Sequence, residues 1–439
     1  MARPFRPEIR GSLTCGLSSG AGDLYSRAML KPILLAALGL MVGLLAAEPK
    51  VRLGSEVLAA RGFKELRGKR VALITNQTGV NRAGRSTIDL LRAAPGVRLV
   101  ALMAPEHGLR GTYGAGQEFP DETDPSTGLK VFSLYGPGPT RKPTPAMLKG
   151  IDAVVYDLQD LGVRSYTYIS TLGLAMEACG AAGVEFVVLD RPNPLGGLRV
   201  EGPPLNPRFR SFVGQWNVPY AYGLTCGELA RMLNGERWIT NRPSLTVVPL
   251  EGWQRSMVWR DTGLPWVATS PNVQTAAAGL HLVSTGVLGE LGGVSIGMGT
   301  DSPFQLVGAP WLNVAKFCEV MSAYRLPGVR FTPVRFTPTR GMFKDQSVPG
   351  ARIVMVSPAT APLVALNYYL LEAVKKTSGR DLFAEAVKRG KNFTMFDKVT
   401  GSDVTRKDLQ VGRSARRIVE SWRDFEESFR QRRARHLLY

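Results

Sequence analysis

Short apolar runs alternate with helical patterns over the first half of the chain. The runs are too short for typical helices and predict buried strands, at residues 70–75, 97–103, 130–134, 153–156 and 184–189. Helical patterns occupy the segments between them, at residues 54–66, 87–94 and 170–182. Strands bounded by helices predict a mostly parallel sheet that is covered on both faces.

The second half shows a weaker version of the same alternation. A Pro- and Gly-rich stretch begins near residue 202, and helical and strand patterns follow it, with strands at 245–250 and 352–356 and a charged amphipathic helix at 414–435. The length of 439 residues is too great for one ordinary core. We predict an α/β protein with a Rossmann-like, mostly parallel sheet domain and a second, smaller α/β domain. The predicted parts are an upstream extension with a signal peptide (1–47), the Rossmann-like catalytic domain (50–235) and a C-terminal α/β domain that completes the cleft (236–439).

A leader-like segment precedes the first predicted helix. Residues 29–32 include a lysine, residues 33–47 are continuously apolar or small, and Glu48 and Pro49 follow. The apolar run is short for a membrane-spanning helix and is typical of a signal peptide. The sequence therefore predicts export to the periplasm or the medium, with membrane attachment only through an uncleaved signal.

The charge balance favours an anionic partner. Lys and Arg number 55 against 36 Asp and Glu, which gives a formal net charge of +19. The charge is spread along the chain, and no zinc-finger, ribonucleoprotein or basic-zipper pattern accompanies it, so we expect no nucleic-acid partner. Neither GxGxxG after a strand nor GxxxxGK[ST] occurs, which argues against a nucleotide cofactor. With only three His, a metal site built from several histidines is nearly excluded, although an all-carboxylate site is not, and we predict no metal site.

Polar side chains follow four of the predicted strands. Ligands of open parallel sheets bind at the carboxyl ends of the strands, so these side chains would share one rim. The rim residues are Asn76, Glu106, His107, Asp157, Gln159, Asp160, Arg164, Asp190, Arg191 and Asn193, with Tyr166 and Tyr168 beside them. The sequence therefore predicts a polar pocket with clustered carboxylates.

Several of these residues have simpler interpretations. Asp157 and Asp190 suit helix caps or strand ends, Arg191 could pair with Asp190, and the two tyrosines could only pack. Glu106 is harder to explain this way, because it follows a buried strand in a Pro-Glu-His-Gly loop, where a Glu has little packing use. Clustered carboxylates suit general acid–base work such as glycoside hydrolysis, and a crowded Glu would have a raised pKa. Serine hydrolase chemistry is a weaker candidate because no GxSxG elbow occurs.

A collinear set of short motifs resembles the NamZ family of glycoside hydrolases. In the first half the matching strings lie at residues 74–79 (ITNQTG), 104–111 (APEHGLRG), 157–162 (DLQDLG), 166–170 (YTYIS) and 190–197 (DRPNPLGG). Others are residues 124–128, 133–136, 141–144 and 223–229, and in the second half 261–266, 270–272, 308–311, 336–338 and 437–439. The order is kept from about residue 54 to the end, which makes the set specific.

The resemblance implies an exo-acting enzyme that releases N-acetylmuramic acid from non-reducing ends of peptidoglycan fragments. It implies a site between a Rossmann-like and a smaller domain, without a cofactor. Glu106 would be the key catalytic carboxylate and general acid, assisted by His107 and Asp160. Arg164 or Arg191 would hold the lactyl carboxylate of the sugar. The other rim residues would bind substrate, together with Asn272 of the Ser-Pro-Asn string.

One stretch departs from the family pattern. A Glu and two Arg of the expected run are Ile296, Met298 and Ser302 in this chain, and Gly292–Gly293 replaces a Thr-Asn pair. This departure leaves open two alternatives: a non-catalytic envelope glycan-binding protein, and a glycosidase for a different amino sugar.

Two nearby carboxylates, Glu290 and Asp301, are candidate replacements for the missing Glu. A different hydrolase, such as an esterase or a deacetylase, would need a nucleophile–His pair or metal ligands, and the scarcity of His argues against it.

Overall fold

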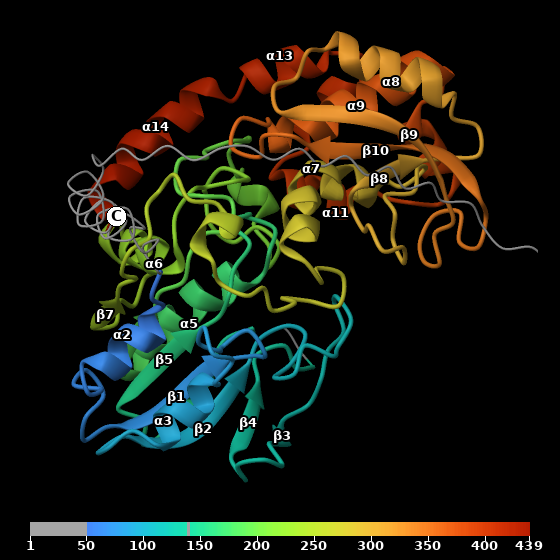
Figure 1. Ribbon diagram of the computed structural model, residues 1–439. Helices are drawn as coiled ribbons and strands as arrows, with labels where there is room; N and C mark the ends of the chain where they lie inside the picture. Colours follow the sequence, from blue (N-terminus) through green and yellow to red (C-terminus); the bar gives the residue numbers. More distant parts are fainter. Residues whose placement is uncertain (1–50, 138–140) are drawn as a thin grey trace, which may run out of the picture. The chain divides into compact units, whose positions relative to one another are not determined.

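The computed structural model describes residues 51–137 and 141–439, and these residues belong to one compact unit (Figure 1). The predicted signal peptide within residues 1–47 lies outside the described residues. No helix of the described part combines the length and apolar character that a membrane crossing requires. The division of the compact unit into domains at residues 235 and 236 stays a prediction.

A seven-stranded sheet, counted over the described residues, dominates the first half of the unit. Its order is β3-β4-β2-β1-β5-β6-β7, and all neighbours are parallel except β3 and β4. The strands are β1 (Arg70–Thr75), β2 (Arg98–Ala104), β3 (Glu122–Thr123), β4 (Lys130–Ser133), β5 (Ala153–Asp157), β6 (Glu185–Leu189) and β7 (Leu245–Val248). The predicted mostly parallel sheet is confirmed.

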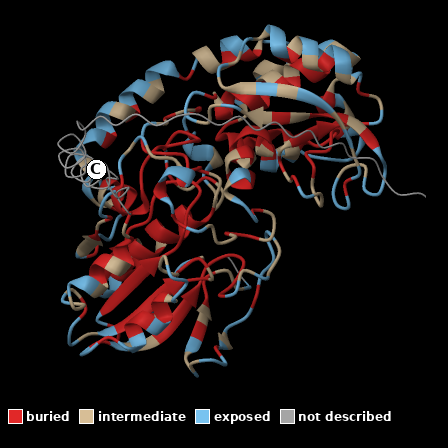
Figure 2. Cartoon of the chain, viewed as in Figure 1, coloured by how far each residue is buried: buried red, intermediate tan, exposed pale blue. Residues whose placement is uncertain are grey.

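Helices cover both faces of this sheet. Side chains alternate between faces along a strand, so Ala72 and Ile74 of β1 join one core and Val71 and Leu73 join the other. The first core includes α4 (Pro145–Leu148), α5 (Tyr168–Ala182) and α6 (Cys226–Gly235), and the second includes α2 (Gly54–Ala60) and α3 (Thr87–Arg92). Figure 2 shows these strands as buried throughout much of their length, which explains their unbroken apolar sequences.

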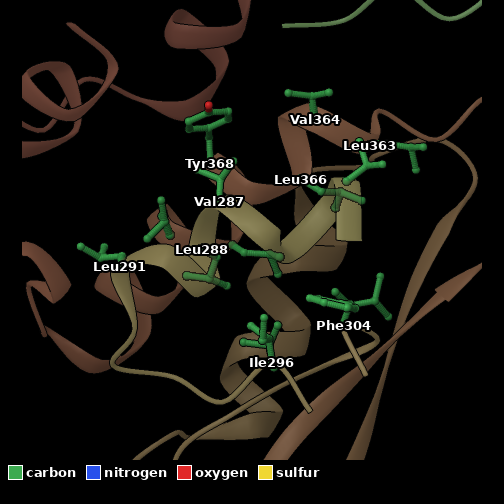
Figure 3. Packing of buried hydrophobic residues seen from close by; sticks show 14 of the residues in the cluster. Val287, Leu288, Leu291, Ile296, Phe304, Leu363, Val364, Leu366 and Tyr368 are labelled. Carbon is green, nitrogen blue, oxygen red and sulfur yellow. The ribbon is translucent and has the colours of Figure 1, made fainter. Parts of the chain in front are cut away.

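A smaller antiparallel sheet forms the second half, in the order β8-β10-β9. Its strands are β8 (Leu306–Gly308), β9 (Val329–Phe336) and β10 (Val348–Met355), and its helices are α7 (Ala276–Leu291), α8 (Val314–Ala323) and α9 (Leu363–Ser378). Figure 3 shows the core, where Val287, Leu288 and Leu291 of α7 pack near Leu366 and Tyr368 of α9. The predicted second α/β part is therefore present.

Five further helices close the chain, namely α10 (Leu382–Lys388), α11 (Thr394–Thr400), α12 (Val404–Gln410), α13 (Ala415–Glu420) and α14 (Arg423–Arg433), and single 3₁₀ turns lie at Pro207–Phe209, Trp259–Thr262 and Ala434–His436. The predicted single helix at 414–435 is wrong, because the chain breaks at Trp422. This side chain is buried and packs on Tyr368 with ring centroids 5.2 Å apart. Anchoring the indole in the core separates α13 from α14.

The prediction that the strand at residues 245–250 belongs to the second part is wrong. In the structure β7 pairs with β6 through Phe186–Leu245 to Leu189–Val248 and forms the edge of the large sheet. An apolar strand pattern does not specify its partner, because strand pairing is a long-range contact.

Candidate active site

A cavity of about 650 Å³ lies where the loops after β2 and β5 meet elements of the second half. The β2 and β5 loops contribute Glu106, His107, Ser165, Tyr166 and Thr167. The second half contributes α7, the segment that links α7 to β8, the β9–β10 connection at Gly341 and Met342, Lys391, and α11. The predicted position at the carboxyl ends of parallel strands thus holds for the N-terminal wall. The size suits one or two sugar rings.

Glu106 is the carboxylate on the N-terminal wall. It lies two residues beyond β2 and is only 7% exposed. Its Oε1 accepts a hydrogen bond from the Gly116 N–H (2.7 Å), and its Oε2 accepts one from the Thr167 hydroxyl (2.6 Å). Tyr135 lies beside Glu106, and burial together with this carboxylate raises the pKa of the Tyr135 phenol. These contacts fix the Glu106 side chain while it faces the cavity.

His107 also lines the cavity, in an unusual backbone conformation. Its φ is +73°, in the left-handed region that non-glycine residues rarely adopt, and Gly108 follows at +75°. Its Nδ1 lies 2.9 Å from the carbonyl oxygen of Tyr113 and must donate to it. The second ring nitrogen therefore lacks the proton when the ring is neutral. Such strain at a loop residue is typical of functional sites.

Two more predicted site residues, Tyr166 and Asn272, line the cavity. Tyr166 packs edge-on against Tyr168, with ring centroids 4.9 Å apart. The Oδ1 atom of Asn272 is buried and has no hydrogen-bond partner among the described residues. A buried, unsatisfied amide oxygen beside a cavity is available to a ligand donor.

The remaining nine predicted site residues are buried, and none of them lines this cavity. They are Asn76, Asp157, Gln159, Asp160, Arg164, Tyr168, Asp190, Arg191 and Asn193. Gln159 and Arg191 border a separate void of about 20 Å³, which is the size of a water molecule. The sheet edge is therefore a layered polar network, of which only the outer layer reaches the cavity.

Arg164 cannot hold a substrate carboxylate, because its terminal nitrogens are already engaged. The side chain is fully buried, and it donates to the carbonyl oxygens of Pro203 (2.7 Å), Val218 (2.9 Å), Val399 (3.3 Å) and Thr400 (2.8 Å). Burial without a partner carboxylate lowers its pKa to about 10. Arg164 thus ties the end of α11 to the loops beside the large sheet.

Arg191 is likewise engaged, but with Asp157 rather than with the adjacent Asp190. It donates two hydrogen bonds to the Asp157 carboxylate and one to the Val80 carbonyl. Asp157 also accepts from the Thr87 hydroxyl. This buried ion pair commits the Nε and Nη2 atoms of Arg191 to protein partners, and the side chain does not line the cavity.

Asp190 anchors the start of α6 and the end of the chain. It accepts hydrogen bonds from the Gly227 N–H, the Thr225 hydroxyl and the Tyr439 hydroxyl, and burial raises its pKa to about 6. The helix-cap interpretation is therefore the one that the structure supports.

Asp160 is buried behind the cavity wall. Its Oδ2 accepts from the Gly162 N–H and the Tyr222 hydroxyl, and burial raises its pKa to about 6. Asn193 likewise serves main-chain groups, the Leu195 N–H and the Leu224 carbonyl. Both side chains shape the loops after β5 and β6.

Asn76, Tyr168 and Gln159 also form hydrogen bonds within the protein, although the buried Oε1 of Gln159 has no partner among the described residues. The Asn76 amide donates to the Tyr168 hydroxyl, which donates to the Thr269 carbonyl, at 2.7 Å each. Gln159 donates to the carbonyls of Asp160 and Pro192. These bonds join the loops after β1 and β5 to each other and to the second half.

Sequence reasoning missed much of the cavity lining. Tyr135 and Thr167 lie within motif strings at residues 133–136 and 166–170, and those strings were the available signal. The second half adds Leu282, Glu290, Val294, Ile296, Met298, Phe304, Met342, Lys391, Met395 and Val399, for most of which no local pattern existed.

The stretch at residues 295–304, which departs from the family pattern, therefore contributes to the lining of the cavity. Ile296 and Met298 line the cavity, whereas Ser302 is buried and accepts a hydrogen bond from Arg352. Of the two candidate replacements, Glu290 lines the cavity and Asp301 does not. Burial raises the pKa of Glu290, and Lys391 partly offsets this. Over the described residues, no group of three or more His, Cys, Asp or Glu is arranged to hold a metal ion.

The fold and the site define an α/β enzyme that presents a hydrogen-bonded glutamate in a polar cavity. Family models for the exo-β-N-acetylmuramidase NamZ match almost all of the described chain, the N-terminal model at residues 71–277 and the C-terminal model at 282–439. The chain belongs to the NamZ family, and the resemblance seen in the motifs is confirmed.

Individual relatives agree with this assignment. The peptidoglycan β-N-acetylmuramidase NamZ of Bacillus subtilis (strain 168) is 39% identical over 394 residues, which are 90% of this chain and 92% of the relative. A crystal structure of a DUF1343 family protein from Bacteroides fragilis NCTC 9343 is 43% identical with a TM-score of 0.81. A second such protein from the same organism is 30% identical with a TM-score of 0.70, and each pair covers 89% of this chain and 99% of the other.

Proposed function

We propose that this protein is an exo-acting glycoside hydrolase that releases N-acetylmuramic acid from the non-reducing ends of peptidoglycan fragments. The observation that carries the proposal is Glu106, a carboxylate held by two hydrogen-bond donors at a cavity of sugar size in a NamZ-family chain. The 39% identity to a peptidoglycan β-N-acetylmuramidase, over nine-tenths of the chain, supports the substrate class.

Glu106 is the proposed general acid. In the reaction, the bond between the anomeric carbon and the glycosidic oxygen breaks, that oxygen takes a proton, and water supplies the new hydroxyl group. The Thr167 hydroxyl can donate to the ionised carboxylate or accept from the protonated one, so it suits both stages of a proton transfer. The Gly116 N–H keeps the other oxygen in place.

Hydrolysis of a chromogenic N-acetyl-β-muramide tests the proposal, with the N-acetyl-β-glucosaminide as the control substrate. We expect turnover of the muramide by the wild type and a fall in kcat of roughly 10²–10⁴-fold in Glu106→Gln. Glu319→Gln, the same change at an exposed position of α8 outside the cavity, should leave kcat unchanged.

Two outcomes would count against the proposal. No turnover of either substrate by folded wild type would reject the muramidase activity and favour a glycan-binding protein. Full turnover by Glu106→Gln would reject the role of Glu106.

We also propose that the protein is exported, because residues 29–49 have the pattern of a signal peptide and the substrate lies outside the cytoplasm. The test is mass spectrometry of the protein recovered from the periplasm or medium. A mature N-terminus near Glu48 is expected, and a full-length protein confined to the cytoplasm would contradict export.

A further inference from the structure

The cavity contains one unassigned cation. Its lining includes two carboxylates, Glu106 and Glu290, and among the described residues that line it Lys391 is the one lysine or arginine. The two arginines expected to bind the lactyl carboxylate, Arg164 and Arg191, are engaged elsewhere. A sugar that carries a carboxylate therefore meets a single fixed positive side chain in this cavity.

The structure holds the Lys391 ammonium at the cavity in two ways. The main-chain N–H of Lys391 donates to the Ala386 carbonyl oxygen, and this bond fixes the turn after α10. Its Nζ donates to the main-chain carbonyl of Glu290, at 3.2 Å. An ammonium has three N–H groups, so two remain for a ligand after this bond.

Glycines keep space around this ammonium. Gly292 and Gly293 have φ values of +70° and +89°, which side-chain-bearing residues rarely adopt. A Cβ at position 292 would lie 3.5 Å from the Lys391 Nζ, and any longer side chain there would fill the volume beside the ammonium. Because Gly292 and Gly293 carry no side chains, the Lys391 ammonium stays accessible to a ligand although the backbone passes close to it.

The exposed Lys391 has both apolar and charged neighbours. Ile296, Met298 and Met342 line the same cavity, and the Met342 sulfur and the Arg389 Nη2 lie 3.7 Å and 3.8 Å from the Cβ position of Gly292. The apolar side chains suit the methyl group of a lactyl substituent.

We propose that Lys391 binds the lactyl carboxylate of N-acetylmuramic acid and so selects muramic acid over N-acetylglucosamine. This inference rests on the proposed function and names the specificity residue of the same site. The neighbouring Glu290 carboxyl would repel the lactyl group if ionised, and burial, which raises its pKa, reduces that repulsion.

The test compares the chromogenic N-acetyl-β-muramide with its lactyl methyl ester, which lacks the negative charge. In Lys391→Met, KM for the muramide should rise roughly ten- to hundredfold, with kcat changed by less than about threefold, because a hydrogen bond to a charged group is lost. KM for the ester should be the same in both proteins. Lys391→Arg should keep most of the affinity, and Lys388→Met, an exposed α10 position outside the cavity, should match the wild type.

An unchanged KM for the muramide in Lys391→Met, or an equal loss on the ester, would overturn the inference. Failure of the proposed function is seen separately, as no turnover by the wild type. In that case calorimetry with free N-acetylmuramic acid and N-acetylglucosamine decides. A preference for muramic acid that Lys391→Met removes supports the inference, and its absence in the wild type overturns it.

Discussion

Arg164→Met removes a buried guanidinium that donates four hydrogen bonds to main-chain carbonyl oxygens. Hydrogen bonds to charged groups contribute about 1.5–3 kcal/mol each, so the four together stabilise the fold by at least about 6 kcal/mol. The opposing cost of burial follows from the pKa, which is lowered from 12.5 to about 10 and corresponds to about 3 kcal/mol. The substitution should therefore destabilise the protein by at least about 3 kcal/mol.

Thermal unfolding measures this loss. For a unit of this size we expect the midpoint to fall by about 5 °C. Arg260→Met, which removes an exposed guanidinium, is the matched control and should leave the midpoint unchanged. A midpoint within about 1 °C of the wild type would refute the structural role. A raised KM for the muramide at unchanged stability would instead restore the ligand-binding role that the sequence predicted.

Three further perturbations probe the same network. Thr167→Val should lower kcat about tenfold in the muramide assay, without a change in melting temperature, because Glu106 loses a hydrogen-bond donor; an unchanged kcat would contradict this. Asp160 has a folded pKa of about 6 against 3.8, so its stabilising effect is present below about pH 4 and lost as the pH rises through 6. Between pH 4 and pH 7 the unfolding free energy of the wild type should therefore fall by up to about 3 kcal/mol more than that of Asp160→Asn, which has no carboxyl group to titrate at this position. Denaturant titrations measure this difference, and an equal pH dependence in the two proteins would refute the assignment. Tyr439→Phe removes the hydroxyl that bridges Asp190 and the Leu250 N–H and should cost about 1–3 kcal/mol by the same method; an unchanged denaturant midpoint would count against it.

The carboxylate of the site could be predicted from sequence, and most of its predicted neighbours could not. Glu106 stood out because a Glu in a Gly/Pro loop beyond a buried strand has no packing role. Asp157 and Arg191 looked equally functional, but they form a buried pair across 34 positions of sequence. Strand patterns place residues at a sheet edge, whereas the direction and partners of each side chain depend on contacts between distant segments.

The wall contributed by the second half illustrates the same limit. Lys391 lies in a turn with no motif, and Glu290 could be proposed only from its nearness in sequence to the stretch that departs from the family pattern. Both reach the site because the core around α7 and α9 sets where the helix ends and where the following loop turns (Figure 3).

The sequence by itself determined the parallel sheet, the second α/β part, the family and Glu106, because each depends on local periodicity or on a short string of residues. The tertiary structure decided which polar residues are buried supports and which meet a ligand. Four of the thirteen predicted site residues line the cavity, since burial and hydrogen-bond pairing are settled by long-range packing. The same packing decided that Lys391, rather than Arg164 or Arg191, supplies the positive charge of the site.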